Sequence, residues 1–114
     1  MIYHITTEKN WQIARELGEY KPGSLKSEGF IHCSTEAQLP KVIEAFYRDI
    51  PNIVILSISL EKLESPVKWE DPVHLQGENR LTVAETETFP HIYGAINLEA
   101  VEKVTSLAQF QFNR

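Results

Sequence analysis

Residues 28–35, EGFIHCST, predict an extended segment that carries a glycine, an imidazole and two hydroxyls. Side chains alternate across a strand, so Phe30, His32 and Ser34 should lie on one face. Thr35 is followed three residues later by a glutamine, which is the spacing of a helix cap. The segment therefore predicts a strand with one polar face, suited to a cleft wall or to a solvated surface, and a helix after it.

The composition predicts one globular domain over residues 1–114. Hydrophobic residues make up 42% of the chain and charged residues 24%, and the length suits a single core. The net charge of −5 disfavours general binding to nucleic acid. The longest apolar run, residues 53–56, is too short to cross a membrane. A single cysteine and the lack of a signal-like leader lead us to expect a cytoplasmic protein.

One helix is predicted before the central segment and one after it. The first follows an N-terminal strand, has Thr7 as its N-cap and ends at Gly18. Its apolar residues recur every three positions and predict one buried stripe, made by Trp11, Ala14 and Leu17. The second helix is predicted over residues 35–47. A kink or restart is expected at Pro40, because proline is disfavoured beyond the first helical position.

Most of the remaining chain is predicted to form strands. Residues 53–58 are apolar on both faces at first, as in the buried middle strand of a sheet. Shorter strands are predicted at residues 67–70, at residues 89–96 with Pro90 at the start or on an edge, and at residues 104–112. Turns are expected at residues 60–63 and 98–101, and loops at residues 19–28, which could overhang a site, and at residues 71–87. This order of elements predicts an α+β fold.

Four histidines offer acid–base chemistry or phosphate binding near neutral pH. His32 and His91 are the leading candidates, because they lie in predicted strands beside aromatic or hydroxyl residues. His4 ranks below them, and His74 ranks last because its loop offers no partner. For each of them, the alternative is a structural imidazole that is satisfied by backbone groups.

A metal site and a thiol nucleophile are both disfavoured in the central segment. His32 and Cys33 are adjacent, so they point to opposite faces of a strand and cannot easily hold one metal ion. The same geometry predicts that Cys33 is buried and inert. Ser34 has two interpretations of equal weight, as a ligand contact or as a strand-end and capping residue, and no third residue at a diagnostic spacing supports a catalytic triad.

Glu70 and the aromatic residues near His91 complete the set of candidates. Trp69 could raise the pKa of the Glu70 carboxyl by desolvation and make it an acid or a base. The alternative is a core tryptophan beside a solvated glutamate. Tyr93 shares a face with His91 and offers a ring that could stack on a base or on nicotinamide, whereas Phe89 is expected to pack in the core.

Four motifs carry a resemblance to a known family: YHI at residues 3–5, GFIHCST at residues 29–35, KWE at residues 68–70 and FPHIYG at residues 89–94. They resemble the domain of unknown function 952 family over nearly the whole chain. The resemblance implies a fold similar to that of the ADP-ribosyltransferase superfamily, whose split antiparallel sheets hold NAD in a cleft. The fold class expected from it is α+β, with ADP-ribosyltransferase-like split antiparallel sheets and two main helices.

The resemblance also implies roles for individual residues. His4 looks like the first-strand histidine that contacts the NAD ribose, and His32 looks like the residue that stacks on nicotinamide. Glu70 and Glu85 are both candidates for the catalytic glutamate at the third position of the superfamily pattern. His91 is a further candidate for the polar residue at that position.

The leading hypothesis is a small cytoplasmic enzyme of ADP-ribosyltransferase or phosphotransferase type that uses NAD as a substrate. RNA 2′-phosphotransferases are the nearest analogy, because they resemble this histidine-rich version of the superfamily and act on a phosphate through NAD. Ile5 stands where the superfamily usually has a glycine for close backbone approach, and this substitution argues against NAD binding. The alternative is a nonenzymatic module that binds a nucleotide or another small ligand. No metal, membrane or general nucleic-acid partner is expected. The expected catalytic residues are His32, His91 and Glu70, and the expected ligand-binding residues are His4, Ser34 and Tyr93.

Overall fold

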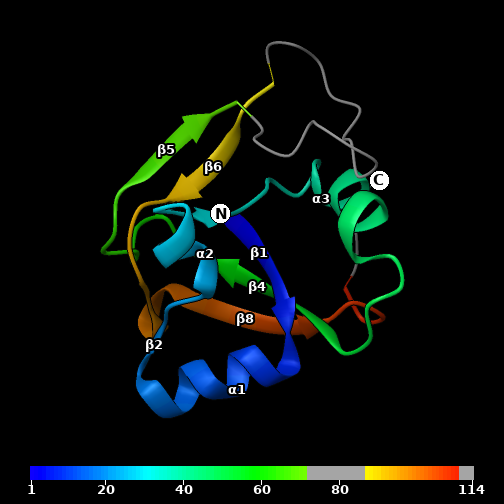
Figure 1. Cartoon of the computed structure of the whole chain (residues 1–114), viewed down its shortest axis with the longest axis horizontal. Coiled ribbons are helices and arrows are strands. Elements are labelled where there is room, and N and C mark those ends of the chain that lie inside the picture. Colours follow the sequence, from blue (N-terminus) through cyan, green and yellow to red (C-terminus); the bar gives the residue numbers. More distant parts are fainter. Residues whose placement is uncertain (72–86, 111–114) are drawn as a thin grey trace.

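The computed structural model of the chain describes residues 1–71 and 87–110 and has the predicted α+β architecture (Figure 1). Within the described residues, the antiparallel strands form sheets with the orders β1-β4-β8, β2-β7 and β3-β6-β5. The strands are β1 (Ile2–Thr7), β2 (Glu19–Tyr20), β3 (Ile31–His32), β4 (Ile53–Ile58), β5 (Val67–Glu70), β6 (Phe89–Ile92), β7 (Ile96–Asn97) and β8 (Val101–Ser106). The helices are α1 (Glu8–Leu17), α2 (Gly23–Ser27), α3 (Leu39–Val42), the π-helix η1 (Ile43–Tyr47) and the 3-10 helix η2 (Leu98–Ala100).

Strand β4 lies in the middle of its sheet, between β1 and β8, which confirms the prediction for this segment. Every residue of β4 is buried, and its side chains alternate between two cores. Leu56 and Ile58 belong to the first core, whereas Ile53 and Ile55 belong to the second core, together with residues of α3 and η1. Burial on both faces is the reason for the nearly continuous aliphatic run in this strand.

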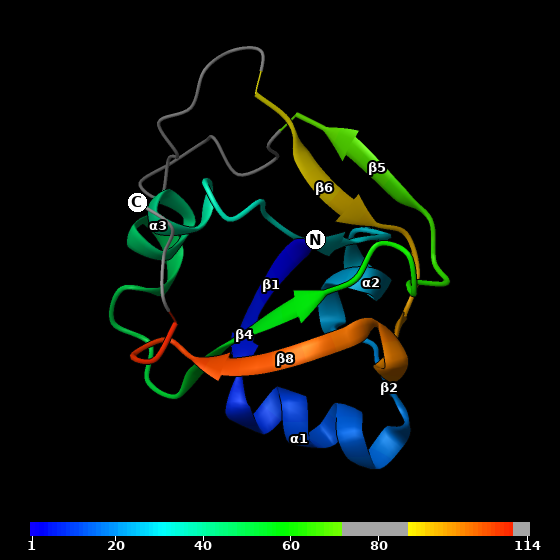
Figure 2. The ribbon, with the colours of Figure 1, turned by 180° about the vertical axis from the view of Figure 1, so that it is seen from behind.

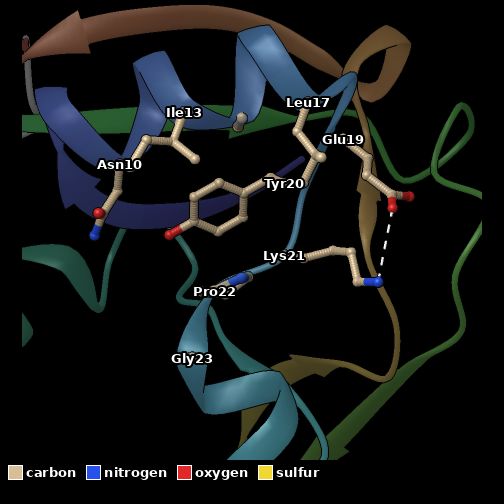
Figure 3. A pocket seen from close by; sticks show the side chains of 9 residues that line it. Asn10, Ile13, Leu17, Glu19, Tyr20, Lys21, Pro22 and Gly23 are labelled. Atoms are coloured by element: carbon tan, nitrogen blue, oxygen red, sulfur yellow. Dashed lines mark ion pairs between the residues drawn. The ribbon is translucent and has the colours of Figure 1, made fainter.

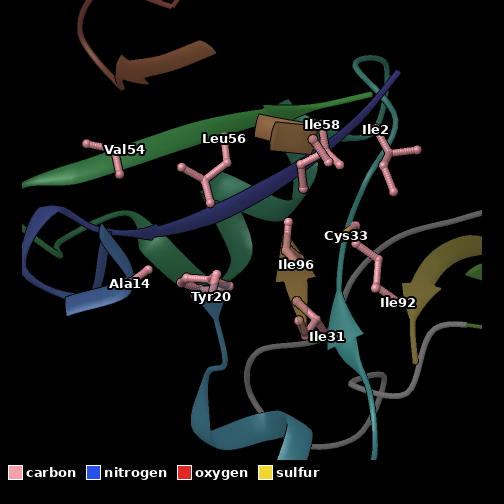
Figure 4. Close-up of a cluster of buried hydrophobic side chains, with 11 residues drawn as sticks. Ile2, Ala14, Tyr20, Ile31, Cys33, Val54, Leu56, Ile58, Ile92 and Ile96 are labelled. Carbon is pink, nitrogen blue, oxygen red and sulfur yellow. The ribbon is translucent and has the colours of Figure 1, made fainter. Parts of the chain in front are cut away.

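The first core joins the β1-β4-β8 sheet to the inner face of the β3-β6-β5 sheet (Figure 4). Leu56 of β4, Ile31 of β3 and Ile92 of β6 are fully buried in it. Since side chains alternate along a strand, the neighbours His32 and His91 point away from this core. The packing of the two sheets therefore leaves both histidines on the outer face of β3-β6-β5. Strands β5 and β6 of this sheet lie at the upper left of Figure 1 and the upper right of Figure 2.

Helix α1 begins and ends as its sequence predicts. The Thr7 hydroxyl accepts a hydrogen bond of 3.1 Å from the backbone N–H three residues on, and Gly18 closes the helix with a φ of 96°. Ala14 is buried in the first core, and Trp11 packs against that core. The predicted apolar stripe is wrong at Leu17, which is exposed because the helix ends there and the chain turns into β2.

The second predicted helix starts later than expected. Thr35 and Gln38 form the reciprocal hydrogen bonds expected of the cap: the N–H of Thr35 donates to Gln38 Oε1 at 2.9 Å and the N–H of Gln38 donates to Thr35 Oγ1 at 3.3 Å. These bonds close a turn and not a helix, because the N-cap of α3 is Gln38, which makes no side-chain capping hydrogen bond. Helix α3 begins only at Leu39. Pro40 therefore lies in the first helical turn, where its missing N–H needs no partner, rather than deeper in the helix. The rest of the predicted helix is the π-helix η1.

Pro90 is the second residue of β6, which agrees with the predicted position near the start of a strand, but β6 is a middle strand and not an edge strand. Its carbonyl accepts a hydrogen bond of 3.0 Å from the N–H of Cys33, so its nitrogen also faces the side of β3. Strand β3 ends at His32, and its pairing with β6 does not extend to Pro90. The missing N–H thus removes no hydrogen bond from the paired part of the ladder.

Other predicted segments end at different positions. The last strand, β8, runs from Val101 to Ser106 rather than over residues 104–112, because its pairing with β4 starts opposite Ile58. The strand predicted at residues 89–96 is divided into β6 and β7, and residues 19–28 contain β2 and α2 instead of an open loop. His74 and Glu85 lie outside the described residues. None of the described helices has the length and apolarity needed to span a membrane.

Gly94→Ala should lower the free energy of unfolding by about 1 to 3 kcal/mol, the usual range for overpacking. A Cβ at Gly94 would lie 2.4 Å from Ser65 Oγ and 2.9 Å from Ser65 Cβ. Ser65 resists moving aside, because its hydroxyl donates to the Ala95 carbonyl at 2.6 Å. Thermal melts measure the effect, with Gly23→Ala as the control because a Cβ there meets no atom within 4 Å. Equal melting temperatures for the two variants would show that Ser65 does not limit this position.

Candidate functional site

His32 and His91 face each other across neighbouring strands. They are paired in the register of β3 and β6, and their ring centroids lie 5.5 Å apart. Lys68 of β5 is paired with His91 on its other side. Phe30 stacks on His91 at 4.3 Å, and His91 is 2% exposed, whereas His32 keeps 30% of its side chain exposed. One row of the sheet therefore carries two imidazoles and an ammonium group.

Each imidazole has a carboxylate partner. His32 Nε2 lies 2.5 Å from Glu28 Oε2, and His91 Nδ1 lies 2.8 Å from Glu70 Oε1. A carboxylate oxygen accepts, so each of these ring nitrogens carries a proton and donates it. Such contacts fix the tautomer and the orientation of both rings.

Glu70 receives two hydrogen bonds on the same oxygen. Its Oε1 accepts from the His91 ring and also from the Tyr93 hydroxyl, at 2.6 Å. Among the described residues, Oε2 of Glu70 has no hydrogen-bond partner, and the side chain is 37% exposed. The Nζ atom of Lys68 lies 4.8 Å from the centroid of the Tyr93 ring. The site thus presents a held carboxylate with one oxygen available to a ligand.

The pKa of Glu70 is lowered, which corrects the expectation that Trp69 would raise it. The hydrogen bond from Tyr93 is the largest cause, followed by the hydrogen bond from His91. Trp69 is 49% exposed on an edge strand, so it neither packs in the core nor desolvates the carboxyl. The same contact with Glu70 raises the pKa of Tyr93. Glu70 therefore stays ionised at neutral pH.

His4 is buried inside the protein rather than exposed on the outer face of the sheet. Its Nδ1 lies 2.6 Å from the His32 carbonyl, and its Nε2 lies 2.7 Å from the Tyr20 hydroxyl, which in turn lies 2.9 Å from that of Thr6. The carbonyl accepts, so Nδ1 carries the proton and Nε2 accepts from Tyr20. Burial lowers the pKa of His4 to about 4. The geometry favours a structural imidazole over the predicted ligand contact.

Ser34 and Cys33 are both buried where the chain leaves β3. The backbone of Ser34 pairs with Tyr3, with 2.8 Å hydrogen bonds in both directions, so Ser34 joins β1 instead of continuing the row of His32. This pairing supports the strand-end interpretation of Ser34. Burial raises the pKa of the Cys33 thiol, and the prediction that Cys33 is buried is confirmed.

Sequence reasoning missed Glu28 as part of the site. Glu28 follows α2 directly and is four residues before His32, a spacing that brings side chains together on a helix. The sequence predicts a loop up to residue 28 and a strand around His32. In such a segment a spacing of four residues does not predict a contact between side chains. A bend at Gly29, where φ is 89°, lies between α2 and the strand that carries His32.

The segment predicted to overhang a site instead borders a small surface hollow of about 190 Å³ (Figure 3). The ring of Tyr20 lies in its wall, near Pro22, and an ion pair of 3.9 Å joins Lys21 to Glu19 at its edge. None of the predicted site residues lines this hollow. Among the described residues, no group of three or more His, Cys, Asp or Glu side chains is placed to hold a metal ion.

The motifs that build the outer face of β3-β6-β5 also connect the chain to known sequences. The family model described as "Protein of unknown function (DUF952)" matches residues 5–104. The chain belongs to this family. The DUF952 assignment confirms the family resemblance of the YHI, GFIHCST, KWE and FPHIYG motifs.

Solved structures of protein CC0527 from Caulobacter crescentus are similar in fold to this DUF952 chain. The crystal structure has a TM-score of 0.75 at 24% identity and covers 92% of this chain and 83% of that chain. The solution NMR structure has a TM-score of 0.68 at 24% identity and covers 93% and 83%. At this identity, the similarity shows the fold alone. No curated protein matches the chain significantly.

Proposed function

We propose that this DUF952 protein is a group-transfer enzyme of ADP-ribosyltransferase or phosphotransferase type, with NAD or a related nucleotide as its substrate. The observation that carries the proposal is the Glu70 carboxylate. One of its oxygens is held by His91 and Tyr93, and the other has no partner among the described residues. The proposal includes an ADP-ribosyltransferase-like arrangement of split antiparallel sheets, which the packing of β1-β4-β8 on β3-β6-β5 supports.

A held carboxylate beside imidazoles suits cleavage of the bond between nicotinamide and ribose. In this step the C–N bond breaks, nicotinamide leaves with the electron pair, and positive charge develops on the ribose. The free oxygen of Glu70 stabilises that charge. His32 is the more exposed imidazole and takes the proton from the acceptor hydroxyl that adds to the ribose. His91 holds Glu70 in place through its Nδ1–H.

The surroundings of the carboxylate suit a nucleotide. Tyr93 is partly exposed on this face, and its ring lies 5.4 Å from that of the buried Phe30, between centroids. A partly exposed aromatic ring is a common support for bases. Lys68 is exposed and supplies a cation for a phosphate group. Tyr93 and Lys68 therefore offer a stacking contact and a phosphate contact next to the two histidines.

A nonenzymatic module that binds a nucleotide is the second candidate. The burial of His91 favours this candidate, because Phe30 covers the His91 ring. A covered ring can hold Glu70 in place but cannot contact a ligand. In that case the protein binds NAD and leaves it intact. Chromatographic detection of nicotinamide after incubation with NAD separates the two candidates.

His32→Ala should weaken the binding of NAD by about 1 to 3 kcal/mol, or roughly five- to 150-fold in affinity. The His32 ring is partly exposed and lies 4.9 Å from the Phe30 ring, so it can contact a bound base or nicotinamide. Its removal leaves the two cores intact, and the melting temperature should change little. Isothermal titration calorimetry with NAD and ADP-ribose, together with thermal melts, measures both effects.

Lys9→Ala, an exposed position on α1, is the control and should bind like the wild type. If the wild type binds neither NAD nor ADP-ribose, the proposed substrate class is wrong. If His32→Ala keeps its affinity but melts at a much lower temperature, His32 is a structural residue.

A further inference from the structure

Strand β5 forms an outer edge of its sheet (Figure 1). Among the described residues, β5 pairs with β6 on one side and with no strand on the other. Trp69, in the middle of β5, is 49% exposed, and its neighbour Lys68 is exposed as well. A strand edge of this kind presents backbone groups and side chains to which another strand can pair.

The hydrogen bonds between β5 and β6 show which backbone groups of β5 face this edge. The N–H of Tyr93 donates to the Pro66 carbonyl at 2.8 Å, so these two residues are a hydrogen-bonded pair. Hydrogen-bonded and non-hydrogen-bonded pairs alternate along an antiparallel ladder. In the register of β5 and β6, the backbone of Lys68 therefore points toward β6, and the N–H and C=O groups of Val67 and Trp69 point outward.

The charges of β5 select one way for two copies to pair antiparallel along this edge. Because only outward-facing residues can exchange hydrogen bonds, the two-fold axis can pass at Lys68, at Trp69 or at Glu70. An axis at Lys68 or Glu70 would place a charge opposite its own copy, which is destabilising. An axis at Trp69 places Lys68 of each copy opposite Glu70 of the other. The strand is therefore complementary in charge to a second copy of itself about Trp69.

This arrangement also suits the two faces of the strand. Residues that lie opposite each other share a face, so Lys68 and the partner's Glu70 meet on the outer face, where His91 also lies. Trp69 is on the other face, together with Val67, which packs against the first core. The two Trp69 side chains lie opposite each other, and pairing covers part of each exposed indole ring.

We propose that two copies of this protein pair antiparallel along β5, with the two-fold axis at Trp69, and form one continuous sheet. In this dimer Lys68 of each copy reaches the partner's Glu70, at the oxygen that has no hydrogen-bond partner among the described residues. Each copy thus contributes a residue to the candidate site of the other. The inference does not rest on the proposed function. Since the dimer occupies this oxygen, the proposed reaction would need the monomer.

Analytical ultracentrifugation of the full chain over a range of concentrations measures the dimer. A four-residue edge makes a small interface, and small interfaces associate weakly, so we expect a Kd of roughly 10 to 100 μM. Two-dimensional ¹⁵N–¹H NMR over the same concentrations locates the interface. The amide signals of Val67 and Trp69 should shift with concentration, and their exchange with solvent should slow, because these N–H groups become hydrogen-bonded.

Lys68→Glu and Glu70→Lys test the charge pairing. Each variant alone places like charges opposite each other and should raise the Kd of the dimer at least about tenfold. An equimolar mixture of the two variants places a glutamate opposite a lysine at both positions and should dimerise like the wild type. Lys9→Glu, at an exposed position on α1, is the matched control and should also dimerise like the wild type.

Trp69→Ala is a further variant that keeps both charges and the hydrogen bonds of Glu70. It should weaken the dimer too, because it removes the two opposed indole rings, and thermal melts confirm that each variant is folded. The inference is overturned if the wild type is monomeric at about 1 mM, well above the range of weak specific interfaces. It is also overturned if Lys68→Glu dimerises as tightly as the wild type, if the mixture of folded charge variants stays monomeric, or if the concentration-dependent amide shifts lie away from β5.

Discussion

Acidification from pH 6.5 to pH 4 should remove about 3 kcal/mol of stability through one side chain, His4. His4 is buried, and burial lowers the pKa of its ring from 6.5 to about 4. Its two nitrogens are engaged by the His32 carbonyl and the Tyr20 hydroxyl, an arrangement that fits the neutral ring. Protonation would place an uncompensated charge between the sheets.

The direction follows from the two pKa values. In the unfolded chain His4 takes up its proton near pH 6.5, whereas in the folded protein it does so only near pH 4. Between these values the unfolded state binds more protons, so the free energy of unfolding falls as the pH falls. The contribution is complete above about pH 6.5 and is lost by about pH 4.

Urea unfolding of the wild type and of His4→Asn at a series of pH values measures this contribution. Asparagine offers an amide N–H near the position of Nδ1 and does not titrate, so the stability difference between the two proteins should shrink on acidification. NMR titration of the His4 ring gives its folded pKa directly. A folded pKa near 6.5, or a stability difference that stays constant from pH 7 to pH 4, would show that His4 is not held neutral by burial.

Under the proposed function, Glu70→Gln should lower the rate of nicotinamide release from NAD by about 10²- to 10³-fold, the effect typical of removing one preorganised electrostatic contact to the transition state. Glutamine keeps the size of the side chain and retains an oxygen that accepts from Tyr93. Glutamine lacks the negative charge of Glu70. The hydrogen bonds from Tyr93 and His91 stabilise that charge and thereby lower the pKa of Glu70. The loss should therefore appear in the rate more than in the affinity for NAD.

Nicotinamide release and calorimetric affinity are measured for the wild type, for Glu70→Gln and for Glu61→Gln. Glu61 is exposed in the turn after β4, so its variant is the matched control. A wild type that releases nicotinamide as slowly as a protein-free solution would remove the enzyme proposal and leave the binding module. If the wild type is active and Glu70→Gln is equally active, Glu70 does not stabilise the developing charge.

Local features of the structure were predictable from short stretches of sequence. The cap at Thr7, the stop at Gly18 and the reciprocal bonds of Thr35 and Gln38 depend on residues no more than a few positions apart. The aliphatic run of residues 53–58 predicts a strand that is buried on both faces, and β4 is such a strand in the middle of its sheet. The alternation in the GFIHCST motif likewise placed His32 opposite the core that contains Ile31 and Cys33.

The sequence by itself thus determined the family, the α+β class, the two ends of α1 and the face of the strand on which His32 lies. Only the tertiary structure decided which groups meet there: Glu28 at His32, Glu70 at His91, and the burial of His4 between Tyr20 and the His32 carbonyl. It also moved Ser34 to a pairing with Tyr3. The physical reason is range. Helix caps and strand alternation act between neighbours in the chain, whereas hydrogen bonds, burial and pKa shifts at the site depend on strands that pair across long separations in sequence.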